Sequence, residues 1–239
     1  MGLALNLGAF GHPRQAIALL QQVVATDPHN GDAHYYLGWN LAAIDALEQA
    51  EQAQQKSLEL QPGAMNVHEG LATILVMRGD AKAALAVARQ EPDPASRDFA
   101  VAMALQAAGN HAASDAALKT LIGRDSDVVA YQIAEFYAFR RDSDNVCKWL
   151  DRAWANRDPG IGLLLTDPYI LRSGCPKTGS PHCRSSRVRR LSTAIRPSAI
   201  RGASCVERFV DPALPARFMV RRFCKTVGLP TTTDAMALP

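Results

Sequence analysis

Two segments of the chain share one layout at a spacing of 34 residues, and this spacing limits the possible folds. Pro28 and Pro62 each close a segment with the apolar periodicity of a helix. Superposing these prolines places Ala16 on Ala50. A fixed period in this range indicates a repeat architecture. Small residues allow two helix backbones to approach closely, and proline ends the second helix. The spacing therefore predicts an all-α solenoid of antiparallel helix pairs.

The pattern continues less regularly to about residue 157. Third, fourth and fifth units follow at Leu71-Ala72, Ala102 and Ile133-Ala134. We expect Asp32 and Asp80 to cap helices, because their carboxylates can accept hydrogen bonds from first-turn amides. The helices are expected over 3–10, 13–26, 32–44, 47–60, 66–77, 81–90, 95–107, 111–122, 127–139 and 143–156, with a short end cap at 161–165.

The Leu37-Gly38 pair, Ala50 and Pro62 resemble the tetratricopeptide repeat, whose signature has these residue types at these offsets. The resemblance covers about residues 3–157, with Arg141 where a glycine is usual. It implies a helical superhelix of about four and a half repeats that binds a protein or peptide partner. It also implies that the protein is not an enzyme.

A narrower likeness lies in residues 130–160. The run from Ala130 to Glu135, with Trp149 to Ala153, is similar to the C-terminal repeats of bacterial adenylate cyclase, kinase and winged-helix signalling proteins. This likeness implies that the chain is a remnant of a larger bacterial signalling protein. The first residues lack the basic and apolar regions of a signal peptide, so we expect a cytoplasmic protein.

Charge divides the chain into two parts. Residues 172–225 contain 13 Lys and Arg against 2 acids, whereas the whole chain has a net charge of +3. We therefore expect a repeat domain at 1–171 and a basic tail of low order at 172–239. Reading of part of the tail out of frame would produce the same composition, which resequencing of the gene would test. The alternative function is a nucleic-acid-associated regulator that uses this tail, although the tail lacks interleaved aromatic residues and nucleic acid is the less favoured partner.

The first helix of each pair should line the concave face of the solenoid. Aromatic and Met side chains there suit a bound peptide, although Tyr35, Phe99 and Tyr131 could instead pack between helices. The expected groove residues are Tyr35, Trp39, Asn66, Glu69, Thr73, Met77, Phe99, Met103, Gln106, Tyr131, Glu135 and Phe139.

Other classes of function find little support in the sequence. Five of its six histidines, His12, His29, His34, His68 and His111, fall at predicted helix starts and turns, and none sits with a Ser or Cys and an acid in a catalytic motif. The five cysteines lack metal-site spacing, so we expect no metal and no cofactor. No run of 18 apolar residues occurs, so no membrane-spanning helix is expected.

Overall fold

The structure, a computed structural model, describes residues 1–172, and the expectations about the basic tail beyond Arg172 lie outside this range. Within it, the regular structure is helical throughout. The helices are α1 (Gly2–Ala9), α2 (Pro13–Thr26), α3 (Gly31–Ala43), α4 (Leu47–Leu60), α5 (Val67–Arg78), α6 (Ala81–Ala88), α7 (Pro94–Ala107), α8 (His111–Asp125), α9 (Ala130–Phe139), α10 (Ser143–Asn156), the 3₁₀ helix η1 (Pro159–Leu163) and α11 (Pro168–Arg172).

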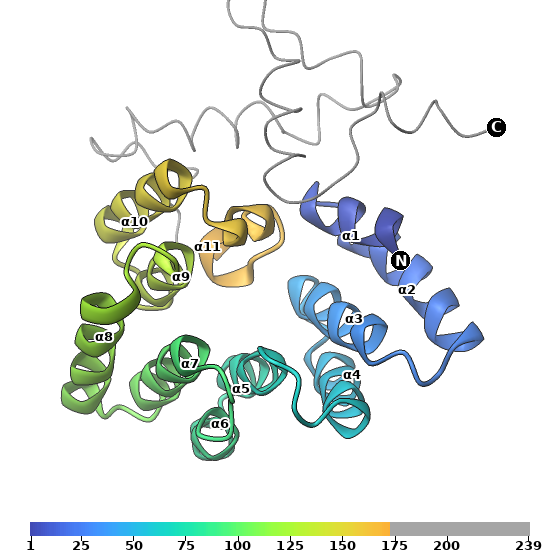
Figure 1. Cartoon of the computed structure of the whole chain (residues 1–239), viewed down its shortest axis with the longest axis horizontal. Coiled ribbons are helices and arrows are strands. Elements are labelled where there is room, and N and C mark those ends of the chain that lie inside the picture. The colour runs from blue at the N-terminus through green and yellow to red at the C-terminus, as the bar shows by residue number, and fades with distance from the viewer. Residues whose placement is uncertain (173–239) are drawn as a thin grey trace, which may run out of the picture.

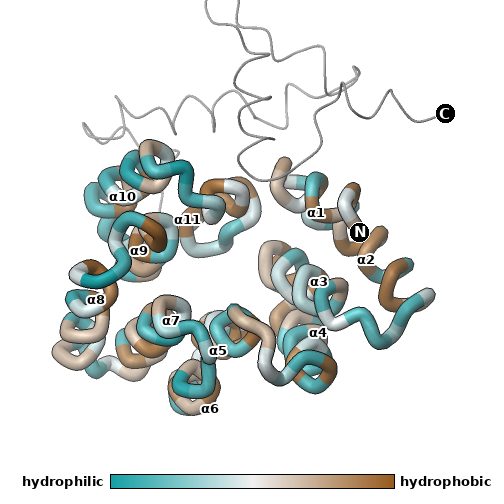
Figure 2. Tube along the Cα trace, in the orientation of Figure 1, coloured by the Kyte–Doolittle hydropathy of each residue, from teal (hydrophilic) through white to brown (hydrophobic). Residues whose placement is uncertain are grey.

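Consecutive helix pairs stack around a strongly curved arc (Figure 1). The first helix of each later pair, α3, α5, α7 and α9, lies on the inner side, and its partner lies outside. Hydrophobic and hydrophilic residues alternate along the helices (Figure 2), as expected when each helix buries one side. The predicted all-α helix-pair solenoid is confirmed.

Every helix pair turns through one residue with a left-handed backbone. These residues are Gly11, Asp45, Gly79, Gly109 and Arg141, with φ between 59° and 87°. Glycine adopts this conformation without strain, whereas a residue with a Cβ incurs a cost of about 1 kcal/mol. Arg141 itself adopts the left-handed backbone conformation, so the fifth unit keeps the same turn geometry without a glycine.

The residues at two fixed sequence offsets from these turn residues are buried, and most of them are small. Close approach of two helix backbones requires small side chains at the crossing. One set precedes the turns by seven positions, and the other follows them by five. The first set is Ala4, Gly38, Ala72, Ala102 and Ala134, and the second is Ala16, Ala50, Ala84, Ser114 and Val146.

The core divides into two main clusters that meet at α5. Ile74 of α5 belongs to the N-terminal cluster with Leu20, Leu37 and Leu41 of α2 and α3. Leu71 and Leu75 of the same helix belong to the C-terminal cluster, which continues to α11. The half-buried Met77 packs against both clusters. Helix α5 therefore joins the two parts of the core.

Polar residues that precede the closing prolines reach back to the start of their own helix pair. The Glu91 carboxylate accepts hydrogen bonds from the amides of Asn66 (3.0 Å) and Glu69 (3.1 Å) at the start of α5. Asp158 accepts from the amide of Tyr131 (2.9 Å) at the start of α9. Each carboxylate satisfies amides that have no acceptor within their helix.

The predicted capping residue of α3 is wrong. Asn30, not Asp32, caps this helix, because its side chain accepts a hydrogen bond from the Ala33 amide at 3.0 Å. Asp32 instead lies in the first turn of α3. The predicted cap of α6 is confirmed, since Asp80 accepts from the Ala83 amide at 3.0 Å.

The chain turns inward after α10. The 3₁₀ helix η1 contacts α9, α10 and also α1, so the last repeat meets the first. Leu165 lies close enough to Gly11 that a Cβ there would be 3.3 Å from the Leu165 Cβ. Helix α11, which has no counterpart among the predicted helices, then packs against α9 on the inner side of the arc (Figure 1).

Candidate functional site

The concave face is defined here by the twelve predicted groove residues of α3, α5, α7 and α9. Their exposure varies widely along the arc. Asn66 is exposed, Tyr35, Trp39, Met77, Gln106 and Phe139 are half-buried, and Glu69, Thr73, Phe99, Met103, Tyr131 and Glu135 are buried.

The α3 end of the concave face carries an aromatic ridge. Tyr35 and Trp39 are one helical turn apart, and their rings meet edge to face at 6.4 Å and 80°. Tyr36 packs against Tyr35 in the same manner at 5.2 Å. Because Trp39 keeps part of its surface in solvent, the ridge offers rigid aromatic area to a partner.

The α5 part of the face holds a buried carboxyl group. Burial raises the pKa of Glu69 to about 8, and the nearby carboxylates of Glu91 and Asp93 act in the same direction. Asn66, at the start of α5, accepts a hydrogen bond from the Ser96 hydroxyl of α7 at 2.8 Å. Glu69 therefore binds a proton more readily here than in water.

Phe99 and Met103 contribute to the core rather than to the surface. Both side chains belong to the C-terminal cluster and are at most 1% exposed. Gln106, farther along α7, is half-buried, and its side-chain oxygen accepts hydrogen bonds from Arg140 Nε (2.9 Å) and Nη2 (2.6 Å).

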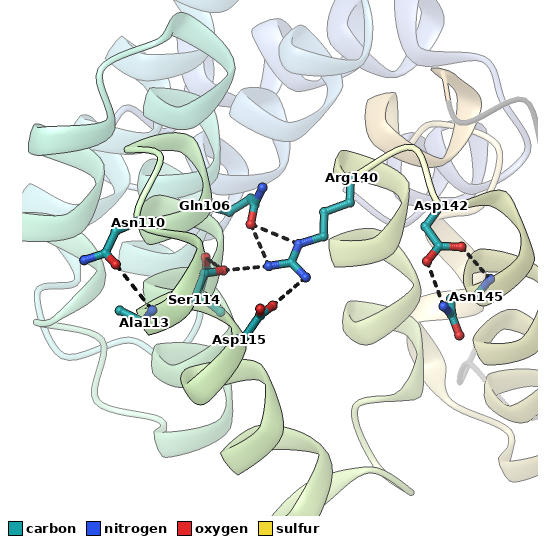
Figure 3. A network of polar contacts seen from close by, with 9 residues as sticks. Gln106, Asn110, Ala113, Ser114, Asp115, Arg140, Asp142 and Asn145 are labelled. Carbon is teal, nitrogen blue, oxygen red and sulfur yellow. Dashed lines mark hydrogen bonds and ion pairs between the residues drawn. The ribbon is translucent and has the colours of Figure 1, made fainter.

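Arg140 joins the fourth helix pair to the fifth (Figure 3). Besides Gln106, its guanidinium reaches the Asp115 carboxylate at 2.7 Å and stacks 4.5 Å from the centre of the Phe136 ring. Five donors in a planar fork suit such multiple contacts. The network fixes the end of α9 against α7 and α8.

The α9 part of the concave face is tied to the inward-turning segment. The Tyr131 hydroxyl donates to the Asp167 carboxylate at 2.9 Å. The same carboxylate accepts from the amides of Tyr169 (2.8 Å) and Ile170 (3.0 Å), and so caps α11. The Phe139 ring meets the Tyr169 ring edge to face at 5.4 Å.

Helix α11 also reaches across to α5. The Tyr169 hydroxyl donates to the backbone carbonyl of Thr73 at 3.4 Å, and Tyr169 is 7% exposed. The hydroxyl of Thr73 itself is buried and has no hydrogen-bond partner. The chain thus covers the concave face between α5 and α9 with its own residues.

Two buried carboxyl groups, Glu135 of α9 and Asp167 before α11, influence each other electrostatically. Burial raises the pKa of Glu135 well above its usual value, and the charges of Asp167 and Glu69 raise it further. Burial raises the pKa of Asp167 to about 6, although its hydrogen bonds from Ile170, Tyr131 and Tyr169 lower it. Burial and the proximity of the two charges therefore favour protonation of the pair.

Asp158, Asp167 and Tyr169 contribute to the site but were missed in the sequence analysis. Asp158 and Asp167 each precede a proline, as do Gln61 and Glu91, which lie against helix starts. A polar residue before proline at the end of a repeat could have identified this role. Tyr169 has no comparable signal in the sequence.

The described residues give no sign of metal chemistry or of a membrane span. In residues 1–172, no three His, Cys, Asp or Glu side chains gather in a way that could hold a metal ion. Among the helices of this range, none combines the length and hydropathy needed to cross a bilayer.

Comparison with known protein families finds a match in the first part of the solenoid. Residues 1–65, which contain α1 to α4, match the family model of the tetratricopeptide repeat. No curated protein matches the chain. Tetratricopeptide repeats generally mediate protein–protein interactions and are typically non-catalytic.

Proposed function

We propose that the protein is a cytoplasmic interaction module that binds a peptide segment of a protein partner on its concave face, with Trp39 as an aromatic anchor. The half-buried ridge of Tyr35 and Trp39 carries this proposal. Aromatic anchors of this kind dominate binding free energy because they bury a large area at low conformational cost.

The neighbouring charges suit a peptide with a polar or basic group next to an apolar one. Glu69 lies close enough to Tyr35 to raise the pKa of its hydroxyl, although burial is the larger cause. A cationic side chain at this place would favour the ionised form of Glu69. The ridge provides the apolar contact, whereas the buried Glu69 would act on a basic group of the peptide through its charge once ionised and not through direct contact.

Selection from a peptide library displayed on phage, followed by calorimetry, tests the proposal. Trp39→Ala should weaken binding of selected peptides by about 2 kcal/mol, or roughly 30-fold. Trp154→Ala is the matched control, because Trp154 is also half-buried but lies on α10 of the outer row. Equal affinity of both variants would remove Trp39 from the site.

A thermal melt of Trp39→Ala separates binding from packing. If Trp39 is an anchor, the midpoint stays within a few degrees of the wild type. If Trp39 is a core residue, its loss costs about 3–5 kcal/mol of stability instead.

We also propose that the module served a bacterial signalling protein. The similarity of residues 130–160 to the C-terminal repeats of such proteins supports this setting. Sequencing of the gene and its upstream region tests it, since an effector domain in the same reading frame is expected. An unrelated upstream gene with its own stop codon would count against this setting, but not against peptide binding.

A further inference from the structure

The last described residues sit on the concave face as a bound peptide would. Residues 159–172 follow the final repeat, turn inward and place α11 beside α9 (Figure 1). Tyr169 then bridges from α9 to α5 through the Phe139 ring and the Thr73 carbonyl. The segment thus spans two repeats that have their own complete helix pairs.

The contacts of this segment combine a polar anchor and apolar anchors. Asp167 accepts a hydrogen bond from the Tyr131 hydroxyl. Ile170 is fully buried, and Tyr169 is 7% exposed. A helix of five residues is too short to be stable by itself in water. Its form therefore depends on the face against which it lies.

Closure of this segment has an electrostatic cost. Glu135, which is 5% exposed, lies within electrostatic range of Asp167 and Glu69, and the Tyr131 hydroxyl lies within range of Asp167 and Glu135. The closed arrangement also leaves the Thr73 hydroxyl buried without a partner. Such costs lower the free energy needed to lift the segment from the face.

We propose that the α5–α9 part of the concave face is a second peptide subsite, that residues 165–172 are its resident occupant, and that a partner enters by presenting a similar Asp-Pro-aromatic-aliphatic segment. The inference rests on the proposed peptide-binding function and adds the chemistry of the ligand. The Asp of the partner segment caps its own short helix and accepts a hydrogen bond from the Tyr131 hydroxyl. The aromatic residue takes the place of Tyr169 between Phe139 and Thr73.

Binding of a labelled peptide with the sequence of residues 165–172 tests the subsite. The full chain with Tyr169→Ala and Ile170→Ala should bind this peptide at least tenfold more tightly than the wild-type chain, whose subsite is filled. Adding Tyr131→Phe, which removes the donor to Asp167, should weaken binding again. The control peptide carries Asp167→Asn, which changes only the charged anchor.

Two outcomes of this titration overturn the proposal. One is a folded double variant that fails to bind the peptide, and the other is equal binding by the wild-type and variant chains. Phage-selected peptides that depend on Trp39 provide the separate readout for the proposed function. If they bind while the 165–172 peptide does not, only the subsite fails.

Hydrogen exchange of the wild-type chain tests the subsite without any substitution. The amides of Tyr169 and Ile170, which donate to Asp167, should exchange faster than the Ile133 amide in α9, because α11 lifts while α9 stays folded. Exchange of all three amides at the rate of global unfolding would show that α11 is a fixed part of the fold, and would overturn the proposal.

Discussion

The regions before and after α5 use the same helix pair in different ways. The turn residues of the first three helix pairs, Gly11, Asp45 and Gly79, repeat at 34 positions, and the concave side of α3 presents half-buried aromatic rings. From α5 to α11 the spacing shortens to 30 and then 32 positions at Gly109 and Arg141. There the concave side is covered by α11 and buries carboxyl groups.

The difference shows what regularity contributes to a solenoid. Where the repeat is regular, small buried residues lie at the helix crossings, and the family model matches residues 1–65. Where the repeat shortens, long-range polar contacts hold the pairs together, such as Arg140 with Gln106 and Asp158 with Tyr131. The irregular region therefore depends on contacts between residues far apart in the chain.

The largest expected effect on stability comes from truncating a buried leucine at an equivalent core position in each region. Leu41 and Leu75 both lie four residues before a turn residue and are 4% and 7% exposed. Replacing either with alanine should lower the free energy of unfolding by about 2–5 kcal/mol. Calorimetry should show a single transition for each variant, because α5 joins both clusters. Two transitions for Leu41→Ala would show that the regions unfold independently.

Overpacking at equivalent helix crossings should have a smaller effect. Ala50 and Ala84 follow their turn residues by five positions, and both are fully buried. Their replacement by leucine should destabilise the protein by about 1–3 kcal/mol each, as measured by urea unfolding. The exposed Ala18 on α2 is the control, and Ala18→Leu should leave the midpoint unchanged. If Ala50→Leu were as stable as the wild type, the close helix crossing would not lie at Ala50.

The pH dependence of stability should come from the region after α5. The folded-state pKa is about 8 for Glu69 and about 6 for Asp167, well above the unfolded values near 4. The folded state therefore binds more protons than the unfolded state between these values. Their stabilising effect is fully present below about pH 4 and is lost as the pH rises towards 8.

Neutralising Glu135 should reduce this loss. Because burial raises the pKa of Glu135, we expect Glu135→Gln to match the wild type at pH 5 and to lose less stability than the wild type as the pH rises. Urea unfolding at both pH values measures the difference. The control is Glu59→Gln in α4, where the carboxylate is exposed and no such gain is expected. A pH profile of Glu135→Gln parallel to that of the wild type would contradict the role of Glu135.

The smallest expected effect is a gain at the irregular turn. Arg141 is exposed and has a φ of 59°, which disfavours any residue with a Cβ. Arg141→Gly should stabilise the protein by about 0.5–1 kcal/mol. Asn110→Gly, next to the turn that already has Gly109, is the control and should be destabilising through loss of its cap on α8. Destabilisation by Arg141→Gly would show that this side chain stabilises the turn.

The sequence by itself determined the helix pairs, because each pair depends on local features. Proline positions, small residues and the 34-residue spacing predicted α2, α4 and α10 to the residue. The cap at Asp80 followed from its place before Ala81. The wrong cap at Asp32 arose because Asn30, two residues earlier, can make the same hydrogen bond.

Only the tertiary structure decided what covers the concave face. A five-residue helix has no periodicity that a sequence could reveal, and α11 forms where Asp167 meets Tyr131, 36 positions earlier in the chain. The burial of Glu69 and Glu135 depends on the packing of other segments against their helices, since each is a polar residue in an ordinary helical position. Local sequence patterns determine where the helices form. Contacts between distant repeats determine which carboxyl groups of the concave face are buried, and so the direction of their pKa shifts.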